Sequence, residues 1–128
     1  MEKKVLLEKY NILTKEILKE NCKFNNTNEI VKNLEENIKN DPIATHIWTF
    51  DHFEHTKNIN WEISEDVEDA KIILFCFGKA ITNPEILAVR PRNIAIVELN
   101  NKFIISFLEA PQAPANEKIW KWINNLVK

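Results

Sequence analysis

The sequence predicts an α+β fold of two layers, a small and mostly antiparallel sheet of about four strands covered by about three helices. Three observations lead to this prediction. Segments with apolar residues at helical spacing alternate with strand-sized apolar runs. Two of these runs are separated only by Asn100 and Asn101, which indicates an antiparallel hairpin. The 128 residues show no repeat and no linker, so we expect one domain over residues 1–128.

The first helix is expected over residues 2–21, so that residues 1–25 would form an N-terminal helical extension of the domain. Its apolar side chains recur every three or four positions, as on one face of a helix. The residues that define this stripe are Leu6, Tyr10, Leu13 and Ile17. Packing of the extension against the rest of the fold is left open.

Two further helices are predicted. Asn26 and Glu29 have the spacing of a capping box and begin a helix that ends near Lys39, because Pro42 follows. Its buried side would carry Ile30, Val31, Leu34 and Ile38. A closing helix follows Pro114, and its stripe places Trp120 in the core and Trp122 at a partly exposed position suited to a subunit contact.

Four runs predict strands: Ala44 to Phe50, Ile72 to Phe77, Asn93 to Leu99, and Lys102 to Leu108. The first would present His46, Trp48 and Phe50 on one face, because strand side chains alternate. Asn tolerates positive φ, so the two-residue hairpin connection is expected to be a type I′ turn.

The composition narrows the class of partner. Basic and acidic residues number 17 and 19, giving a net charge of -2, so we expect no nucleic-acid partner. No apolar run approaches the roughly 20 residues of a membrane span, and none fits a secretory signal. Of the two cysteines, Cys76 is expected to be buried and Cys22 incidental, with no disulfide framework. These features predict a cytoplasmic protein without a membrane partner.

Residues 29–111 resemble a small bacterial family known as domain of unknown function family 302. The similarity consists of Asp51-His52 after a strand, Phe77-Gly78 after an apolar strand, a segment with Pro84 and Pro91, and the end of a hairpin ahead of Pro111. Two departures are the longer stretch after Gly78 and the asparagine at position 101. The resemblance implies a two-layer α+β fold with a strand ahead of the helix, and it implies no established activity.

All three histidines, His46, His52 and His55, lie within ten residues. Asp51, His52 and His55 are candidate metal ligands or acid–base groups, since imidazole and carboxylate are common ligands and positions i and i+3 share a helix face. Asp51 would orient one imidazole in such a site. The alternative is a polar loop with ordinary histidines, and no catalytic residue is assigned.

Arg90 and Arg92 are the only arginines beside fifteen lysines. Guanidinium groups bind carboxylate and phosphate in bidentate fashion, so these two residues are candidates for an anion site. With His52 and Gly78 they form the expected ligand-binding set, although two surface charges would explain them equally well. Gly78 is the only glycine, which excludes a glycine-rich nucleotide loop.

Three functions therefore remain open. The first is a non-catalytic module that binds a small ligand, such as an anion, or a protein, and forms a homodimer. The second is a metal-dependent or acid–base enzyme that uses His52 and His55. The third is a structural or regulatory interaction protein with the first helix as docking surface. No cofactor can be named from the sequence.

Overall fold

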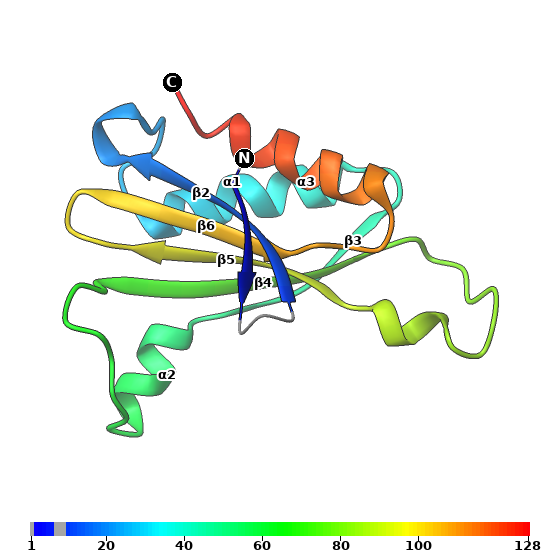
Figure 1. The fold of residues 1–128 in the computed structure, drawn as a ribbon, viewed down its shortest axis with the longest axis horizontal. Coiled ribbons are helices and arrows are strands. Elements are labelled where there is room, and N and C mark those ends of the chain that lie inside the picture. Colours follow the sequence, from blue (N-terminus) through cyan, green and yellow to red (C-terminus); the bar gives the residue numbers. More distant parts are fainter. Residues whose placement is uncertain (1, 7–9) are drawn as a thin grey trace.

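The computed structural model describes residues 2–6 and 10–128, and it shows a single antiparallel sheet with helices on one face (Figure 1). The strand order is β1-β2-β6-β5-β4-β3, and every neighbouring pair is antiparallel. In chain order, the elements are β1 (Glu2–Leu6), β2 (Tyr10–Leu18), the 3₁₀ turn η1 (Lys19–Asn21), α1 (Thr27–Asn40), β3 (Ala44–Phe50), α2 (His52–Asn58), β4 (Asp69–Phe77), the 3₁₀ turn η2 (Ile86–Val89), β5 (Arg92–Glu98), β6 (Lys102–Leu108) and α3 (Ala113–Asn124). The predicted α+β class is confirmed, with six strands rather than four.

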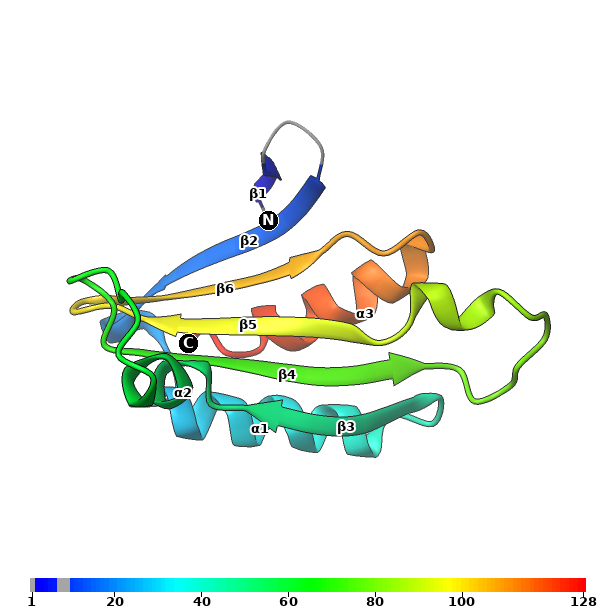
Figure 2. The same ribbon diagram turned by 90° about the horizontal axis from the view of Figure 1, so that it is seen from below.

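Two helices, α1 and α3, lie side by side on one face of the sheet, and Figure 2 shows the strands from the other face. The short α2 follows β3 and lies at one end of that other face, below the start of β4, so most of this face is left open (Figure 1). The core lies between sheet and helices. It contains the predicted stripe of α1 together with the inward side chains of the strands, including Ile73, Phe75, Ile94, Ile96, Phe103 and Ile105, none of which is exposed.

The start of α1 agrees with the predicted cap. The Asn26 side chain accepts a hydrogen bond from the Glu29 N–H at 3.0 Å, and the Glu29 carboxylate accepts from the Asn25 N–H at 3.4 Å. The helix is held to the sheet at the same place, because Glu98 of β5 accepts from both the N–H and the hydroxyl of Thr27. Sequence and packing therefore fix the same first turn.

The prediction of a helix over residues 2–21 is wrong, because the described part of this segment forms the hairpin strands β1 and β2. Leu13 and Ile17 are four residues apart, a spacing that puts them on one face of a strand as well as of a helix. Pairing decides between the two: Ile12 to Leu18 align with Leu108 to Lys102 of β6. There is thus no helical extension and no helical docking surface. The strand implied by the family resemblance is present instead.

Two local predictions also fail. In the hairpin between β5 and β6 neither Asn100 nor Asn101 has a positive φ, since Asn60 and Gly78 alone do so among the described residues; the turn is therefore not type I′. The Asn101 carbonyl accepts a hydrogen bond from the Lys19 N–H at 2.9 Å, which ties the turn to the end of β2.

The second failure concerns β3, where the register shifts between His46 and Trp48. His46 pairs with the buried Phe75 and points toward α1, whereas Trp48 pairs with Leu74 on the uncovered face. A β-bulge adds one residue and reverses the side on which later side chains lie. Strict alternation of side chains had predicted one shared face for His46, Trp48 and Phe50. Because of the bulge, His46 lies on the other face.

The two tryptophans of α3 exchange the places expected for them. Trp122 is 7% exposed and stacks on Phe77 at 5.8 Å between ring centroids. Trp120 is half-buried, with the Lys15 ammonium 4.8 Å from its ring. Ile119, Trp122, Ile123 and Leu126 have the i, i+3, i+4, i+7 spacing of the face that packs on the sheet, so Trp122 offers no subunit contact.

The cysteines are exchanged in the same way. Cys22 is buried in the core, whereas Cys76 is half-exposed on the uncovered face of β4. β4 is an interior strand, but only one of its faces is covered by helices, so its apolar run did not guarantee burial. No helix of the described chain is long and apolar enough to cross a lipid bilayer.

Candidate functional site

A cavity of about 380 Å³ lies where β4 ends, β5 begins and α3 starts. Its walls are mostly apolar, and its charged groups are Arg90, Arg92 and Lys118. The remaining lining residues are Ile43, Phe77, Gly78, Ile86, Val89, Ala110, Gln112, Pro114 and Ala115. The volume is in the range of sites that bind small molecules, which combine apolar walls with a few placed polar groups.

Gly78 shapes one side of this cavity. Its φ of +79° is a conformation that L side chains rarely adopt, and a Cβ at this position would lie 3.1 Å from the Arg90 Nη2. The Gly78 N–H donates to the Ile43 carbonyl at 2.8 Å, which closes the end of the sheet. Arg90 donates to the Ala80 carbonyl at 3.1 Å. The glycine thus lets the chain turn and lets the Arg90 guanidinium pack directly against the backbone.

Arg92 lies on the helix-covered side of β5 and donates from Nη2 to the Leu108 carbonyl at 2.7 Å. Its Nε is buried without a hydrogen-bond partner. Burial lowers the pKa of this guanidinium. No carboxylate offsets its charge among the ion pairs of the described residues. A half-buried cation without an acidic partner creates a local positive potential that favours an anion.

Lys118 of α3 contributes the third cation. Its ammonium lies 2.8 Å from Asp41 Oδ2 and 5.7 Å from the centroid of the Phe77 ring. Burial alone would raise the pKa of Asp41, but the hydrogen bonds from Lys118 and from the Ile43 and Ala44 N–H groups outweigh it and lower the pKa. The carboxylate therefore stays ionised and holds Lys118 at the cavity. Of the three cations of the cavity, only Lys118 is therefore paired with a carboxylate of the described residues.

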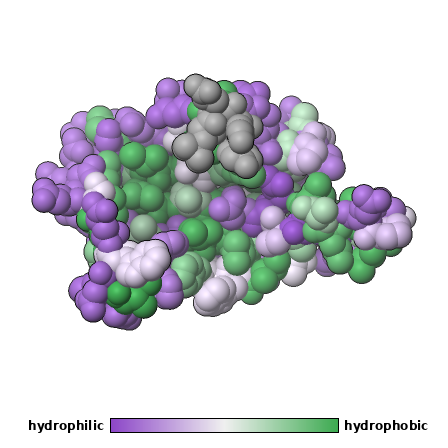
Figure 3. Space-filling model, turned by 60° about the horizontal axis from the view of Figure 1, so that its bottom comes forward, coloured by the Kyte–Doolittle hydropathy of each residue, from purple (hydrophilic) through white to green (hydrophobic). Residues whose placement is uncertain are grey.

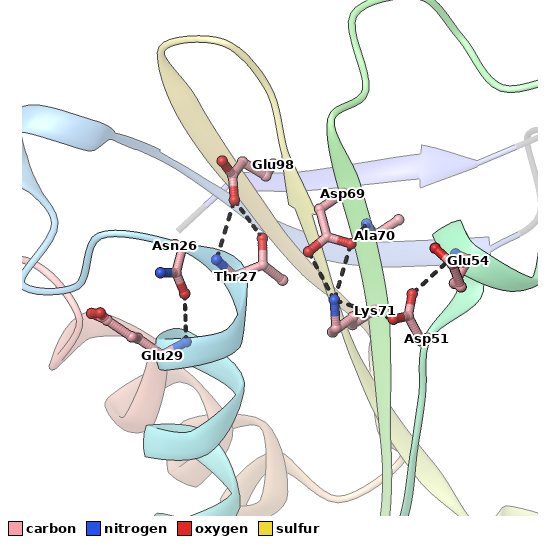
Figure 4. A network of polar contacts seen from close by, with 9 residues as sticks. All are labelled: Asn26, Thr27, Glu29, Asp51, Glu54, Asp69, Ala70, Lys71 and Glu98. Atoms are coloured by element: carbon pink, nitrogen blue, oxygen red, sulfur yellow. Dashed lines mark hydrogen bonds and ion pairs between the residues drawn. The ribbon is translucent and has the colours of Figure 1, made fainter. Parts of the chain in front are cut away.

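The histidine cluster lies at the opposite end of the sheet, about seven residues or 20 Å along β3. The Asp51 carboxylate is engaged elsewhere than on an imidazole: it caps α2 by accepting from the Glu54 N–H at 3.0 Å, and it lies 3.6 Å from the Lys71 ammonium (Figure 4). The rings of His52 and His55 both pack near Phe50, with centroids 5.2 and 5.3 Å from it.

These histidines approach each other without forming a metal centre. Their ring centroids are 6.3 Å apart, and no group of three or more His, Cys, Asp or Glu side chains in the described chain is placed to hold a metal ion. His46 is directed elsewhere by the bulge in β3. Its Nε2 lies 3.2 Å from Glu35 of α1 and 2.9 Å from the Thr49 hydroxyl.

Of the predicted ligand-binding residues, the structure brings together Gly78, Arg90 and Arg92 and leaves His52 apart. Sequence reasoning missed Lys118 and Asp41. Lys118 has no distinguishing signal among fifteen lysines. Asp41 had one: an Asp three residues before a strand, next to Pro42, is suited to accept hydrogen bonds from the backbone that follows, as it does here from Ile43 and Ala44.

Comparison with known proteins places the chain in a family. The model of a family of unknown function, DUF6858, matches residues 1–128. The chain belongs to DUF6858. Its fold is similar to the crystal structure of an uncharacterized conserved protein, DUF302, from Bacillus stearothermophilus, with a TM-score of 0.62 and 16% sequence identity over 90% of this chain and 97% of the other. No curated protein matches the chain. The resemblance drawn from residues 29–111 is thus confirmed at the level of the fold.

Proposed function

We propose that this DUF6858 protein is a non-catalytic binding module for a small molecule with an anionic head and an apolar body. The observation that supports this most directly is the convergence of Arg90, Arg92 and Lys118 on one apolar cavity. Guanidinium groups bind carboxylate and phosphate oxygens through charge-assisted hydrogen bonds, while the walls from Phe77, Ile86 and Val89 suit a hydrocarbon or ring.

The composition of the lining favours binding over catalysis. Among the described residues that line the cavity there is no serine, cysteine, histidine or carboxylate. Nucleophilic or general acid–base chemistry needs such a group, or an amine, within hydrogen-bond reach of the reacting atom. The amine of this cavity, Lys118, is paired with Asp41 at 2.8 Å. The Asp41 carboxylate is engaged by Lys118 and by two backbone N–H groups, so it is occupied as a structural acceptor.

The proposal is tested by calorimetric titration with a graded ligand series. Inorganic phosphate and acetate carry the head alone, octanoate and octyl phosphate carry head and body, and octanol carries the body alone. We expect saturable binding of octanoate or octyl phosphate, weaker binding of the heads, and none of the neutral alcohol. Arg90→Gln and Lys118→Gln should each weaken binding about 10-fold or more, as expected for a charge-assisted hydrogen bond.

The matched control is Lys121→Gln, which removes the same charge from an exposed position three residues further along α3. Its affinity should equal that of the unmodified protein. The proposal fails if no member of the series binds saturably, or if Lys121→Gln weakens binding as much as Lys118→Gln does.

A further inference from the structure

The face of the sheet opposite α1 and α3 is largely apolar, with the neutral polar side chains of Asn93, Ser106 and Thr14 among the apolar ones. The strand registers align its side chains in rows that cross the sheet, for example Phe50 with Ile72 and Ala95, and Ala70 with Val97 and Ile104. On β4 and β5 this face carries no charged side chain: its residues there are Ala70, Ile72, Leu74, Cys76, Asn93, Ala95 and Val97. Figure 3 shows hydrophobic residues over much of this side of the molecule.

The exposure of this face is high for apolar side chains. Trp48 is 57% exposed, with its ring 5.3 Å from that of Phe50, and Leu18 and Leu108 at the other side of the face are 41% and 42% exposed. Monomeric proteins rarely leave contiguous apolar patches of more than a few hundred Å² in water, and larger ones mark interaction surfaces.

Its extent is that of a stable interface. Strands lie about 4.8 Å apart and rise about 3.3 Å per residue, so the five strands β2, β6, β5, β4 and β3, with about seven residues each, present on the order of 550 Å². Two such faces packed together would remove on the order of 1,100 Å² from water, above the roughly 1,000 Å² that a specific interface should exceed. Sheets pack face to face in this manner, about 10 Å apart.

The charges indicate which partner fits. Glu16 of β2 and Lys102 of β6 lie at the margin of the face and neutralise each other, with 3.2 Å between their charged atoms. A nucleic acid or an anionic membrane would need unpaired basic residues there. The strand β1 at the edge of this face carries Glu2 and Lys4, whose charged atoms are 4.0 Å apart, so the described part of the face as a whole has no net charge. Such a surface can pack against an identical one without further charge complementarity. We infer that a second copy of this chain covers the open face, forming a homodimer with the two sheets packed against each other.

The chain contains a reporter for this interface. Cys76 is half-exposed on the open face, whereas Cys22 is buried in the core, so only one thiol of the folded protein is accessible to a reagent. The association state is measured by sedimentation velocity over a concentration series, and the reaction rate of the accessible thiol with Ellman's reagent is followed on the same samples. Because only the monomer would react, a sample that is nine-tenths dimer should react about tenfold more slowly.

Two substitutions locate the contact. Trp48→Lys and Leu74→Lys place a charge on the apolar face, on the edge strand β3 and on the neighbouring β4, and each should give a monomer whose Cys76 reacts at one rate at all concentrations. Asn40→Lys adds the same charge at the exposed end of α1 and should leave the dimer intact. Continued protection of Cys22 shows that each variant is folded. A monomer at all concentrations overturns the inference, and so does a dimer that leaves Cys76 reactive or persists in both face variants.

Discussion

The two ends of the sheet differ in whether their charged side chains have charged or buried polar partners within the protein. At the end that holds the start of α1, charged side chains drawn in Figure 4 have partners within the protein: Glu98 accepts from Thr27, and Lys71 lies 2.8 Å from Asp69. At the other end, Arg90 and Arg92 donate only to backbone carbonyls beside an apolar cavity. The first end stabilises the fold, whereas the second retains positive charge that an outside group can use.

The largest expected effect on stability is at the end of the sheet where Glu98 holds the start of α1. Glu98→Ala removes the carboxylate oxygen that accepts from both donors of Thr27, a fully buried residue, and leaves the Thr27 N–H and hydroxyl without a partner. We expect the free energy of unfolding to fall by about 2–3 kcal/mol, because unsatisfied buried donors are costly. Urea unfolding measures it. Glu98→Gln keeps a neutral acceptor and should lose less; equal losses in the two variants would contradict the explanation.

Acid should weaken the same contact by a smaller amount. Burial alone would raise the pKa of Glu98, but the hydrogen bonds from Lys19 and Thr27 outweigh it, so its pKa is lowered in the folded protein. A carboxyl with a lowered pKa adds stability above its unfolded pKa, and this is lost as the pH falls through the folded value. Stability should thus decline below about pH 4.5. In Glu98→Gln this part of the decline should be missing.

At the cavity end a single methyl group should be informative. Gly78→Ala places a Cβ at positive φ and 3.1 Å from the Arg90 guanidinium. We expect a loss of about 1–2 kcal/mol in unfolding free energy, from backbone strain and the displaced side chain. Octanoate binding should weaken in parallel. Unchanged binding in this variant would show that the position of Arg90 does not matter to the ligand.

The smallest effect is expected at α2. Asp51→Ala removes the cap of a seven-residue helix, while Lys71 keeps Asp69 as its partner. A cap contributes about 1 kcal/mol or less at such an exposed site. Amide exchange should quicken within α2 and stay unchanged in β4. Faster exchange in β4 would mean that Asp51 also supports the sheet.

The sequence predicted those elements whose residue pattern is compatible with only one type of secondary structure. The stripe of α1, the apolar run of β4 and the hairpin partners β5 and β6 lie where expected, because spacing and short connections leave few alternatives. The prediction for the N-terminal segment was wrong, because a four-residue spacing of apolar side chains fits both a helix and a strand. The choice between the two depends on pairing with β6, which is distant in the sequence. The bulge at Ile47 likewise leaves no trace in the alternation of residues.

The candidate site was partly predictable for a similar reason. Gly78, Arg90 and Arg92 were noticeable because each is rare in this chain, and the topology brings them together. Lys118 is one of many lysines, and only the packing of α3 against Phe77 shows its place. Rarity can therefore point to individual site residues, whereas the common residues that complete a site are found only in the fold.

The bulge in β3 also protects the molecule from uncontrolled polymerisation. β3 is an edge strand, and a regular edge offers its free amide and carbonyl groups to the strands of other molecules, which is how fibrils grow. The extra residue at Ile47 interrupts that ladder, so a further strand cannot add in continuous register. The opposite edge strand, β1, exposes the charged side chains of Glu2, Lys3 and Lys4, and charged side chains on an edge strand disfavour pairing with another molecule. Growth along the sheet is blocked at both edges, and only its broad face stays free for contact.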